Sequence, residues 1–85
     1  MANIIIKDGK NRTYCKEVLE VVLLKEHAAV LLKDNRGNVV KILATVSNVD
    51  KVVNYIDHSL LNNEPIIFTI EITNGIKVIT GIGLL

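Results

Sequence analysis

The sequence predicts an α+β fold made mostly of antiparallel β-strands, as a small curled sheet or a small barrel, with one helix. Three observations predict it. Runs rich in Ile, Val and Leu alternate with short polar turns. One segment, near residues 48–61, repeats its apolar residues at the helical period and has helix start and stop signals at its ends. Two stretches, DNRGN and TNG, have the composition of hairpin turns. The element order is β-β-β-β-α-β-β, and 85 residues fit one domain, residues 1–85.

The N-terminal third predicts two strands. Residues 3–7 contain three consecutive isoleucines, and the polar stretch KDGKNR that follows predicts a turn at Gly9. Residues 13–25, TYCKEVLEVVLLK, fit either a helix face or a strand that is buried on both sides. The β-branched residues from Val18 onward favour the strand, with a bend at Lys16–Glu17.

A hairpin and then the helix follow. Residues 27–33 and 38–46 are predicted to pair across DNRGN, in which Gly37 adopts the left-handed conformation. Ser47 is the predicted N-cap of the helix, and Asn62–Asn63 its end, because Pro65 prevents its continuation. The apolar stripe of this helix comprises Val49, Val52, Val53, Ile56 and Leu60.

The C-terminal segment predicts a second hairpin. Asn74–Gly75 is a type I′ turn signal between strands 66–72 and 76–84. Alternation predicts Ile76, Val78, Ile82 and Leu84 on one face of the last strand and Lys77, Ile79, Gly81 and Gly83 on the other. Three strands, a helix and two strands are also the order found in a five-stranded barrel of the OB type, so an OB-like barrel is one form that this fold can take.

The last strand is apolar and has one charge, which makes it hazardous as an uncovered sheet edge. We therefore expect it either to close into a barrel or to pair with a second copy, and we predict a homo-oligomer. The predicted interface comprises Ile76, Val78, Ile79, Gly81, Ile82, Gly83 and Leu84.

Composition limits the function. The net charge of +1 excludes a strongly steering electrostatic field. No apolar run approaches the length of a membrane span, and the single cysteine suits a reducing compartment, so we expect a cytoplasmic protein without a membrane partner. The many Asn, Ile and Lys residues are typical of low-GC mesophiles and their phages, in which case the location is the host cytoplasm.

Residues for catalysis or metal binding are sparse. Cys15, His27 and His58 are the only soft or imidazole ligands, and their spacing matches no zinc motif. No acid, base or nucleophile has a recognisable partner in the sequence. We therefore predict no catalytic residue, no metal and no cofactor, and a protein that is not an enzyme.

Basic residues form the one candidate ligand site. Lys10 and Arg12 flank Tyr14 near the first turn, and further cations follow around the first hairpin. A basic surface with an aromatic side chain can bind a phosphorylated ligand or a single-stranded nucleic acid. The predicted anion- or nucleotide-binding residues are Lys10, Arg12, Tyr14, Lys33, Arg36 and Lys41.

Two functions fit these observations. The first is a small homo-oligomeric interaction module that acts on another protein as an inhibitor, adaptor or accessory subunit. The alternative is an OB-like binder of nucleotides or oligonucleotides that uses the basic patch.

Overall fold

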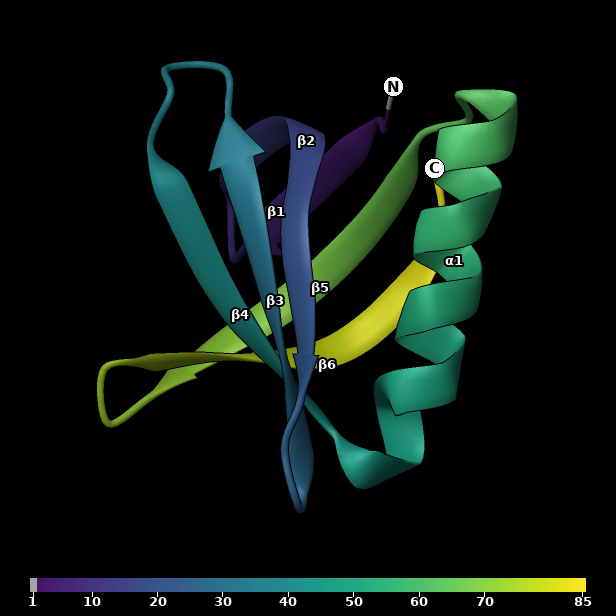
Figure 1. Ribbon diagram of the computed structural model, residues 1–85. Coiled ribbons are helices and arrows are strands. Elements are labelled where there is room, and N and C mark those ends of the chain that lie inside the picture. The colour runs from purple at the N-terminus through teal and green to yellow at the C-terminus, as the bar shows by residue number, and fades with distance from the viewer. Residues whose placement is uncertain (1) are drawn as a thin grey trace.

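The computed structural model describes residues 2–85, which form a closed six-stranded barrel with one helix on its outside (Figure 1). The strands are β1 (Ile4–Asp8), β2 (Asn11–Leu23), β3 (His27–Asp34), β4 (Val39–Thr45), β5 (Ile66–Thr73) and β6 (Ile76–Leu84). A short 3₁₀ turn, η1 (Val46–Asn48), leads into the helix α1 (Val49–Asn62). The predicted class and element order are confirmed, and the barrel replaces the alternative of an open curled sheet.

The strand order around the barrel is β1-β2-β3-β4-β6-β5. Four of the six strand pairs are antiparallel, and two are parallel: β1 with β5, and β4 with β6 at the pair Leu43–Val78. Strand β1 lies between β2 and β5, so the barrel has six strands where an OB-type barrel has five.

Residues 13–25, which fit both a helix and a strand, lie mostly within one long strand, β2. Its pairing with β3 shifts register between Cys15 and Glu17, and again between Val18 and Glu20. Lys16 and Leu19 are the extra residues at these bulges, which bend the strand and increase its twist. The first bulge confirms the predicted bend at Lys16–Glu17.

The second hairpin turn has the predicted backbone. Asn74 and Gly75 have φ angles of 51° and 77°, as a type I′ turn requires. The β5–β6 pairing then shifts register so that Thr80 has no opposite residue, because Thr69 faces Gly81 while Ile70 faces Ile79.

This bulge overturns the predicted alternation of β6. Ile79 faces the barrel interior and is 2% exposed, and Ile82 also packs against the core. Ile79 therefore cannot belong to a surface interface, and its assignment to one was wrong. Strand β6 pairs with β5 along its length and with β4 at the single residue pair Leu43–Val78, so of the two alternatives expected for this strand the single chain shows closure into a barrel.

The start of α1 differs from the sequence prediction. The N-cap position is Asn48, without a side-chain hydrogen bond, and the hydroxyl of Ser47 lies 3.0 Å from that of Thr45. Ser47 is therefore not the cap. The predicted end is confirmed, because Asn63 adopts the left-handed conformation and donates its N–H to the Ser59 carbonyl at 2.8 Å.

The core fills the barrel and continues under α1. Phe68, Ile4, Leu32 and Ile42 are fully buried inside the barrel. From the helix, Val52, Ile56 and Ser59 are buried, whereas Leu60, which was predicted in the apolar stripe, is 43% exposed. Within residues 2–85 we find no helix with both the length and the apolar character needed to cross a membrane.

Candidate functional site

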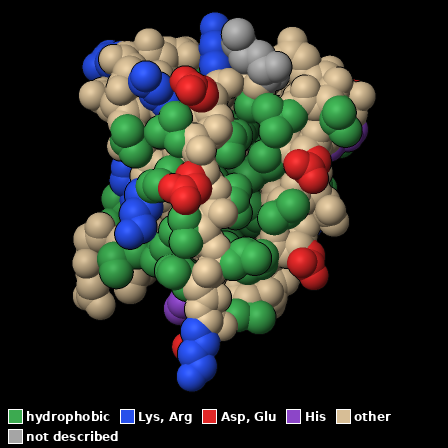
Figure 2. All heavy atoms as spheres, in the orientation of Figure 1, with side chains coloured by type: hydrophobic (Ala, Val, Ile, Leu, Met, Phe, Trp, Pro, Cys, Tyr) green, Lys and Arg blue, Asp and Glu red, His purple; other side chains and the backbone are tan. Residues whose placement is uncertain are grey.

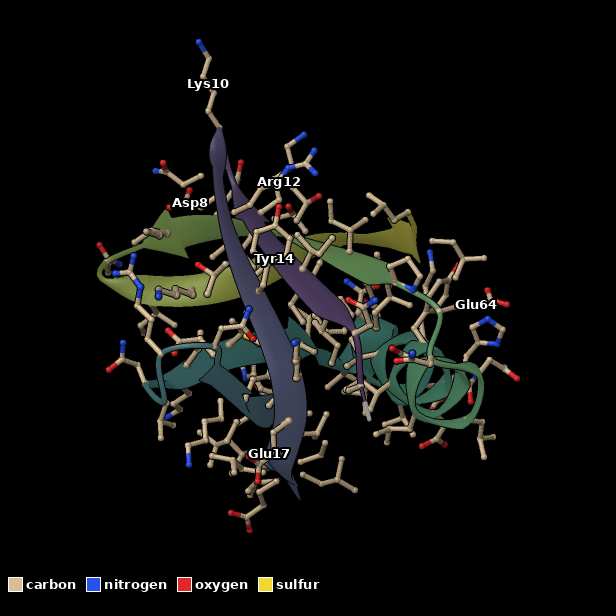
Figure 3. All side chains as sticks on the ribbon, turned by 90° about the horizontal axis from the view of Figure 1, so that it is seen from above. Asp8, Lys10, Arg12, Tyr14, Glu17 and Glu64 are labelled. Carbon is tan, nitrogen blue, oxygen red and sulfur yellow. The ribbon has the colours of Figure 1, made fainter. Side chains whose placement is uncertain are left out.

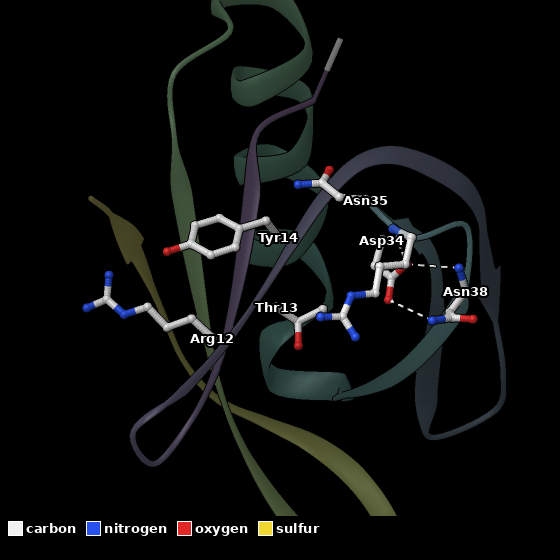
Figure 4. A pocket seen from close by; sticks show the side chains of 7 residues that line it. Arg12, Thr13, Tyr14, Asp34, Asn35 and Asn38 are labelled. Atoms are coloured by element: carbon white, nitrogen blue, oxygen red, sulfur yellow. Dashed lines mark hydrogen bonds between the residues drawn. The ribbon is translucent and has the colours of Figure 1, made fainter.

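A pocket of about 400 Å³ lies between the start of β2 and the β3–β4 turn (Figure 4). It contains three of the six residues predicted to bind an anion or nucleotide, namely Arg12, Tyr14 and Arg36. The complete lining is Arg12, Thr13, Tyr14, Asp34, Asn35, Arg36 and Asn38. Segments more than twenty residues apart in the chain therefore build one site.

Strand geometry places Arg12 beside Tyr14. Residues two apart on a strand project from the same face, and Figure 4 shows the two side chains extended side by side from β2. Both are exposed, the ring of Tyr14 to 49%. The next residue, Cys15, points into the core and anchors this part of the strand.

The β3–β4 turn is attached directly to β2 at the pocket. The backbone N–H of Asn35 donates to the carbonyl of Tyr14 at 3.1 Å. This bond fixes the turn that carries Arg36 next to the strand that carries Tyr14. The sequence gives no signal for it, because it depends on the bulged register between β2 and β3.

Asp34 holds the turn in shape. One of its carboxylate oxygens accepts the backbone N–H of Arg36 at 2.9 Å and that of Asn38 at 2.8 Å, and the other accepts the side-chain amide of Asn38 at 3.4 Å. Gly37, at a φ of 86°, donates its N–H to the Asp34 carbonyl at 3.1 Å. The acceptor capacity of Asp34 is therefore largely used by its own turn.

The pocket is lined by two cationic residues, Arg12 and Arg36, and by one anionic residue, Asp34. The hydrogen bond from the Asn38 backbone, followed by the bond from Arg36, lowers the pKa of Asp34, so its carboxylate stays ionised at neutral pH. Among residues 2–85, the only ion pair within 4 Å joins His58 and Glu64. Arg12 and Arg36 thus form no ion pair at that distance, although the charge of Arg36 helps to lower the pKa of Asp34, and both guanidinium groups can donate hydrogen bonds to a phosphate.

Strand pairing places residues of β1 and β5 in line with Arg12 and Tyr14 on the barrel wall. Lys7 of β1 lies opposite Arg12, and Ile5 lies opposite Tyr14. Ile5 in turn neighbours Ile67 of β5. Residues directly opposite each other on neighbouring strands share a face of the sheet. The pair of Arg12 and Lys7 is therefore cationic, and the neighbouring row of Tyr14, Ile5 and Ile67 is largely apolar. Lys7 was not among the predicted site residues, although a turn at Gly9–Lys10 fixes its register with Arg12.

The other three predicted residues lie outside this pocket. Lys10 extends from the tip of the β1–β2 turn, beyond Arg12 and Tyr14 (Figure 3). Lys33 lines a neighbouring hollow, which it shares with Lys16 and Asp34. Lys41 lines a separate hollow at the β5–β6 turn together with Gly75, Ile76 and Lys77. The six predicted residues therefore do not form one patch on the folded protein.

The cysteine and the histidines do not form a reactive group. Cys15 is 1% exposed, and burial raises the pKa of its thiol to about 11. At the C-terminal end of α1, His58 donates its Nε2–H to the Glu64 carboxylate at 3.0 Å and accepts the side-chain amide N–H of Asn62 at Nδ1, at 3.1 Å. In the described part of the chain, no three His, Cys, Asp or Glu residues gather as metal ligands.

Comparison with protein-family models gives no match, and the comparisons with curated proteins and with solved structures find no similar chain.

Proposed function

We propose that this protein is a small non-enzymatic binding module that holds a nucleotide or a short single-stranded oligonucleotide at the Arg12–Tyr14–Arg36 pocket. The observation that carries the proposal is that the exposed Tyr14 lines one pocket with Arg12 and Arg36, neither of which forms an ion pair within 4 Å. An aromatic ring stacks on a base, and a guanidinium group binds phosphate through two parallel hydrogen bonds. Every nucleotide contains a base and a phosphate, so it can use both contacts.

The remaining lining residues suit a ligand with a polar base. Thr13, Asn35 and Asn38 bring hydroxyl and amide groups to the pocket, which can donate and accept hydrogen bonds. The cationic row at Arg12 and Lys7 gives a phosphodiester backbone a path along the barrel wall. A mononucleotide would use only the pocket, whereas an oligonucleotide would also use this row.

The state of Cys15 supports a binding role without catalysis. A thiol attacks as its thiolate, and a pKa of about 11 leaves very little thiolate at neutral pH. The hydroxyl of Ser59 is buried and hydrogen-bonded to the backbone just after the helix end, so it has a structural role and is not an exposed nucleophile.

Fluorescence anisotropy with a labelled short oligothymidylate tests the proposal. Tyr14→Leu should weaken binding by about 1–3 kcal/mol, as the loss of one stacked base does. Binding through two phosphates gives a slope of about −1.4 for log K against log salt, and Arg36→Gln should reduce its magnitude by about 0.7. Lys51→Gln, an exposed change on α1, is the matched control and should leave affinity and slope unchanged. If all these variants bind like the parent protein, the proposal is wrong.

The second candidate is a self-associating interaction module that serves another protein as an inhibitor, adaptor or accessory subunit. Exposed large apolar side chains favour it, among them Leu23 at 70%, Leu61 at 83% and Leu84 at 56% exposure. Monomeric proteins rarely leave large apolar patches uncovered. For both candidates we propose a cytoplasmic location, which is the host cytoplasm if a phage encodes the chain.

A further inference from the structure

Strand β4 has a free edge beside the β5–β6 hairpin. Within residues 2–85, β4 pairs with β3 along its whole length but meets β6 only at the pair Leu43–Val78. Strand β4 begins at Val39, four residues before Leu43. The tip of the β5–β6 hairpin projects away from the barrel (Figure 1). Residues 39–42 therefore have a paired strand on one side and none on the other.

The backbone groups at this edge point outward at alternate residues. The N–H of Asp34 donates to the carbonyl of Asn38 at 2.9 Å, which identifies a hydrogen-bonded pair at the start of the β3–β4 ladder. Hydrogen-bonded and non-hydrogen-bonded pairs alternate along an antiparallel ladder, so the N–H and C=O groups of Val39, Lys41 and Leu43 point away from β3. Leu43 meets β6 there. The outward groups of Val39 and Lys41 are left for another strand.

A hollow with two cations lies between this edge and the hairpin. It has a volume of about 230 Å³ and is lined by Lys41, Leu43, Gly75, Ile76 and Lys77. Leu43 is half-buried and Ile76 is 49% exposed, so the hollow offers apolar surface as well as charge. Figure 2 shows Lys and Arg side chains beside hydrophobic ones on the side of the barrel where β4 and the β5–β6 hairpin lie.

The charge of this hollow is not balanced by an acidic side chain of the described residues. No Asp or Glu is among its lining residues. The only ion pair within 4 Å in residues 2–85 joins His58 and Glu64, so Lys41 and Lys77 form none. The two hollows beside the β3–β4 turn differ, because each contains Asp34. A ligand that carries carboxylates therefore complements the hollow at the β5–β6 turn.

A free strand edge next to two cations favours an acidic peptide as the ligand. An extended peptide offers N–H and C=O groups that continue a sheet at its edge, and its side chains provide specificity. No aromatic ring lines this hollow, so a nucleic-acid base would have no stacking partner. Two copies of the chain joined through this edge would bring four lysines together, and like charges that face each other are destabilising.

We propose that the β4 edge and the hollow at Lys41 and Lys77 bind an extended acidic segment of a partner protein, which adds a short strand beside residues 39–42. The inference rests on the second candidate function, the interaction module, and names the class of its partner. It does not involve the Arg12–Tyr14–Arg36 pocket.

Fluorescence anisotropy with a labelled, end-blocked heptapeptide of alternating glutamate and valine tests this inference. Lys41→Gln and Lys77→Gln should each weaken peptide binding about twofold to fivefold, as the loss of an exposed ion pair does. The double variant should weaken binding by about the product of the two effects. The matched control is Lys51→Gln, which removes one exposed charge from α1 and should leave peptide affinity unchanged.

A second peptide separates strand pairing from charge attraction. Methylation of the backbone nitrogens of the same heptapeptide keeps its carboxylates and removes its N–H donors. This peptide should bind at least severalfold more weakly, because hydrogen bonds to the outward carbonyls of β4 are lost. Equal binding of the two peptides would show that charge alone attracts the segment, and it would contradict the addition of a strand.

The remaining outcomes also decide the proposal. Loss of affinity in both lysine variants, together with weak binding of the methylated peptide, supports it. Peptide binding that is absent at millimolar concentration, or that the lysine variants do not change, contradicts it. If sedimentation velocity finds that the parent protein self-associates without binding the peptide, the second candidate function stands and this inference is wrong. Oligothymidylate anisotropy on the double variant should match the parent protein, so the peptide surface and the nucleotide pocket are tested separately.

Discussion

The buried hydroxyl of Ser59 joins the helix to the N-terminal segment through Asn3, 56 residues away. Its oxygen accepts the backbone N–H of Asn3 at 2.9 Å, and its O–H donates to the carbonyl of Glu64 at 2.9 Å. Three segments therefore meet at one side chain: the end of α1, the residue before β1 and the loop before β5. The side chain of Ser59 is fully buried, with an exposure of 0%.

Replacing Ser59 should destabilise the whole fold. Ser59→Ala removes a fully buried partner and leaves the N–H of Asn3 without its acceptor, which costs about 1–3 kcal/mol. Urea unfolding followed by circular dichroism measures the change. Ser47→Ala, an exposed hydroxyl that does not cap the helix, should cost far less. Equal losses in the two variants would contradict the joining role of Ser59.

The thiol of Cys15 should make stability fall at high pH. Burial, and secondarily the charge of Asp34, raises its pKa from 9.0 to about 11 in the folded protein. Below pH 9 the thiol is protonated in both states, and its contribution is fully present. Between pH 9 and 11 it ionises only in the unfolded chain, which removes about 2–3 kcal/mol of unfolding free energy.

The comparison for this prediction is Cys15→Ala. That variant should be less stable at neutral pH, because it leaves a cavity, but it should lose less stability than the parent between pH 9 and 11. Lysine and tyrosine side chains contribute equally to both curves. Parallel curves for the two proteins would show that the buried thiol does not contribute to the decline.

Asp34 gives a prediction in which positioning and charge act in opposite directions. Asp34→Ala removes a negative charge from the pocket, and on charge alone an anion should bind more tightly. It also removes the acceptor for the N–H groups of Arg36 and Asn38, so the turn loosens. We expect oligothymidylate affinity to fall severalfold. Asp34→Asn, which keeps one acceptor oxygen, should bind at least as well as the parent.

The ionisation of Asp34 can be measured directly. Its pKa in the folded state is below the ordinary value of 3.8, chiefly because of the Asn38 backbone hydrogen bond. The stabilisation of the turn is thus present above pH 3.8 and is lost as the pH falls through the folded value. Carboxyl carbon NMR should give a midpoint below 3.8, and a midpoint at or above it would contradict this role.

Local chemistry explains which parts of the fold the sequence predicts. The turns at Gly37 and at Asn74–Gly75 need positive φ, and few residues other than Gly and Asn adopt it readily. The end of the helix at Asn63 has the same origin. These signals lie within a few residues, so reading them needs no tertiary information.

Features that depend on contacts between distant segments could not be predicted from the sequence, because no local signal encodes those contacts. The bulge at Thr80 reverses the faces of β6, and it depends on pairing with β5. The place of β1 between β2 and β5 depends on a parallel contact that leaves no periodic signal. The burial of Ser59 gives no sequence signal, because its partners Asn3 and Glu64 lie outside the helix.

The candidate site also combines residues that local strand geometry brings together with residues that only tertiary contacts bring together. Arg12 and Tyr14 could be paired from the sequence, because residues two apart share a strand face. Arg36 joins them only through the bond between Asn35 and Tyr14, and Lys41 is separated from them because β4 carries it toward the β5–β6 turn. Charge and one aromatic ring grouped these six residues in the sequence, whereas strand register and the Asn35–Tyr14 hydrogen bond bring only three of them together.

Two-dimensional NMR of the isotopically labelled protein, titrated with unlabelled oligothymidylate, tests the central claim most directly. We predict that amide shifts concentrate in residues 12–14 and 34–38, with smaller changes at Lys7 and none along the exposed face of α1. Shifts confined to other parts of the barrel, or no shifts at saturating ligand, would contradict the assignment of the Arg12–Tyr14–Arg36 pocket as the binding site.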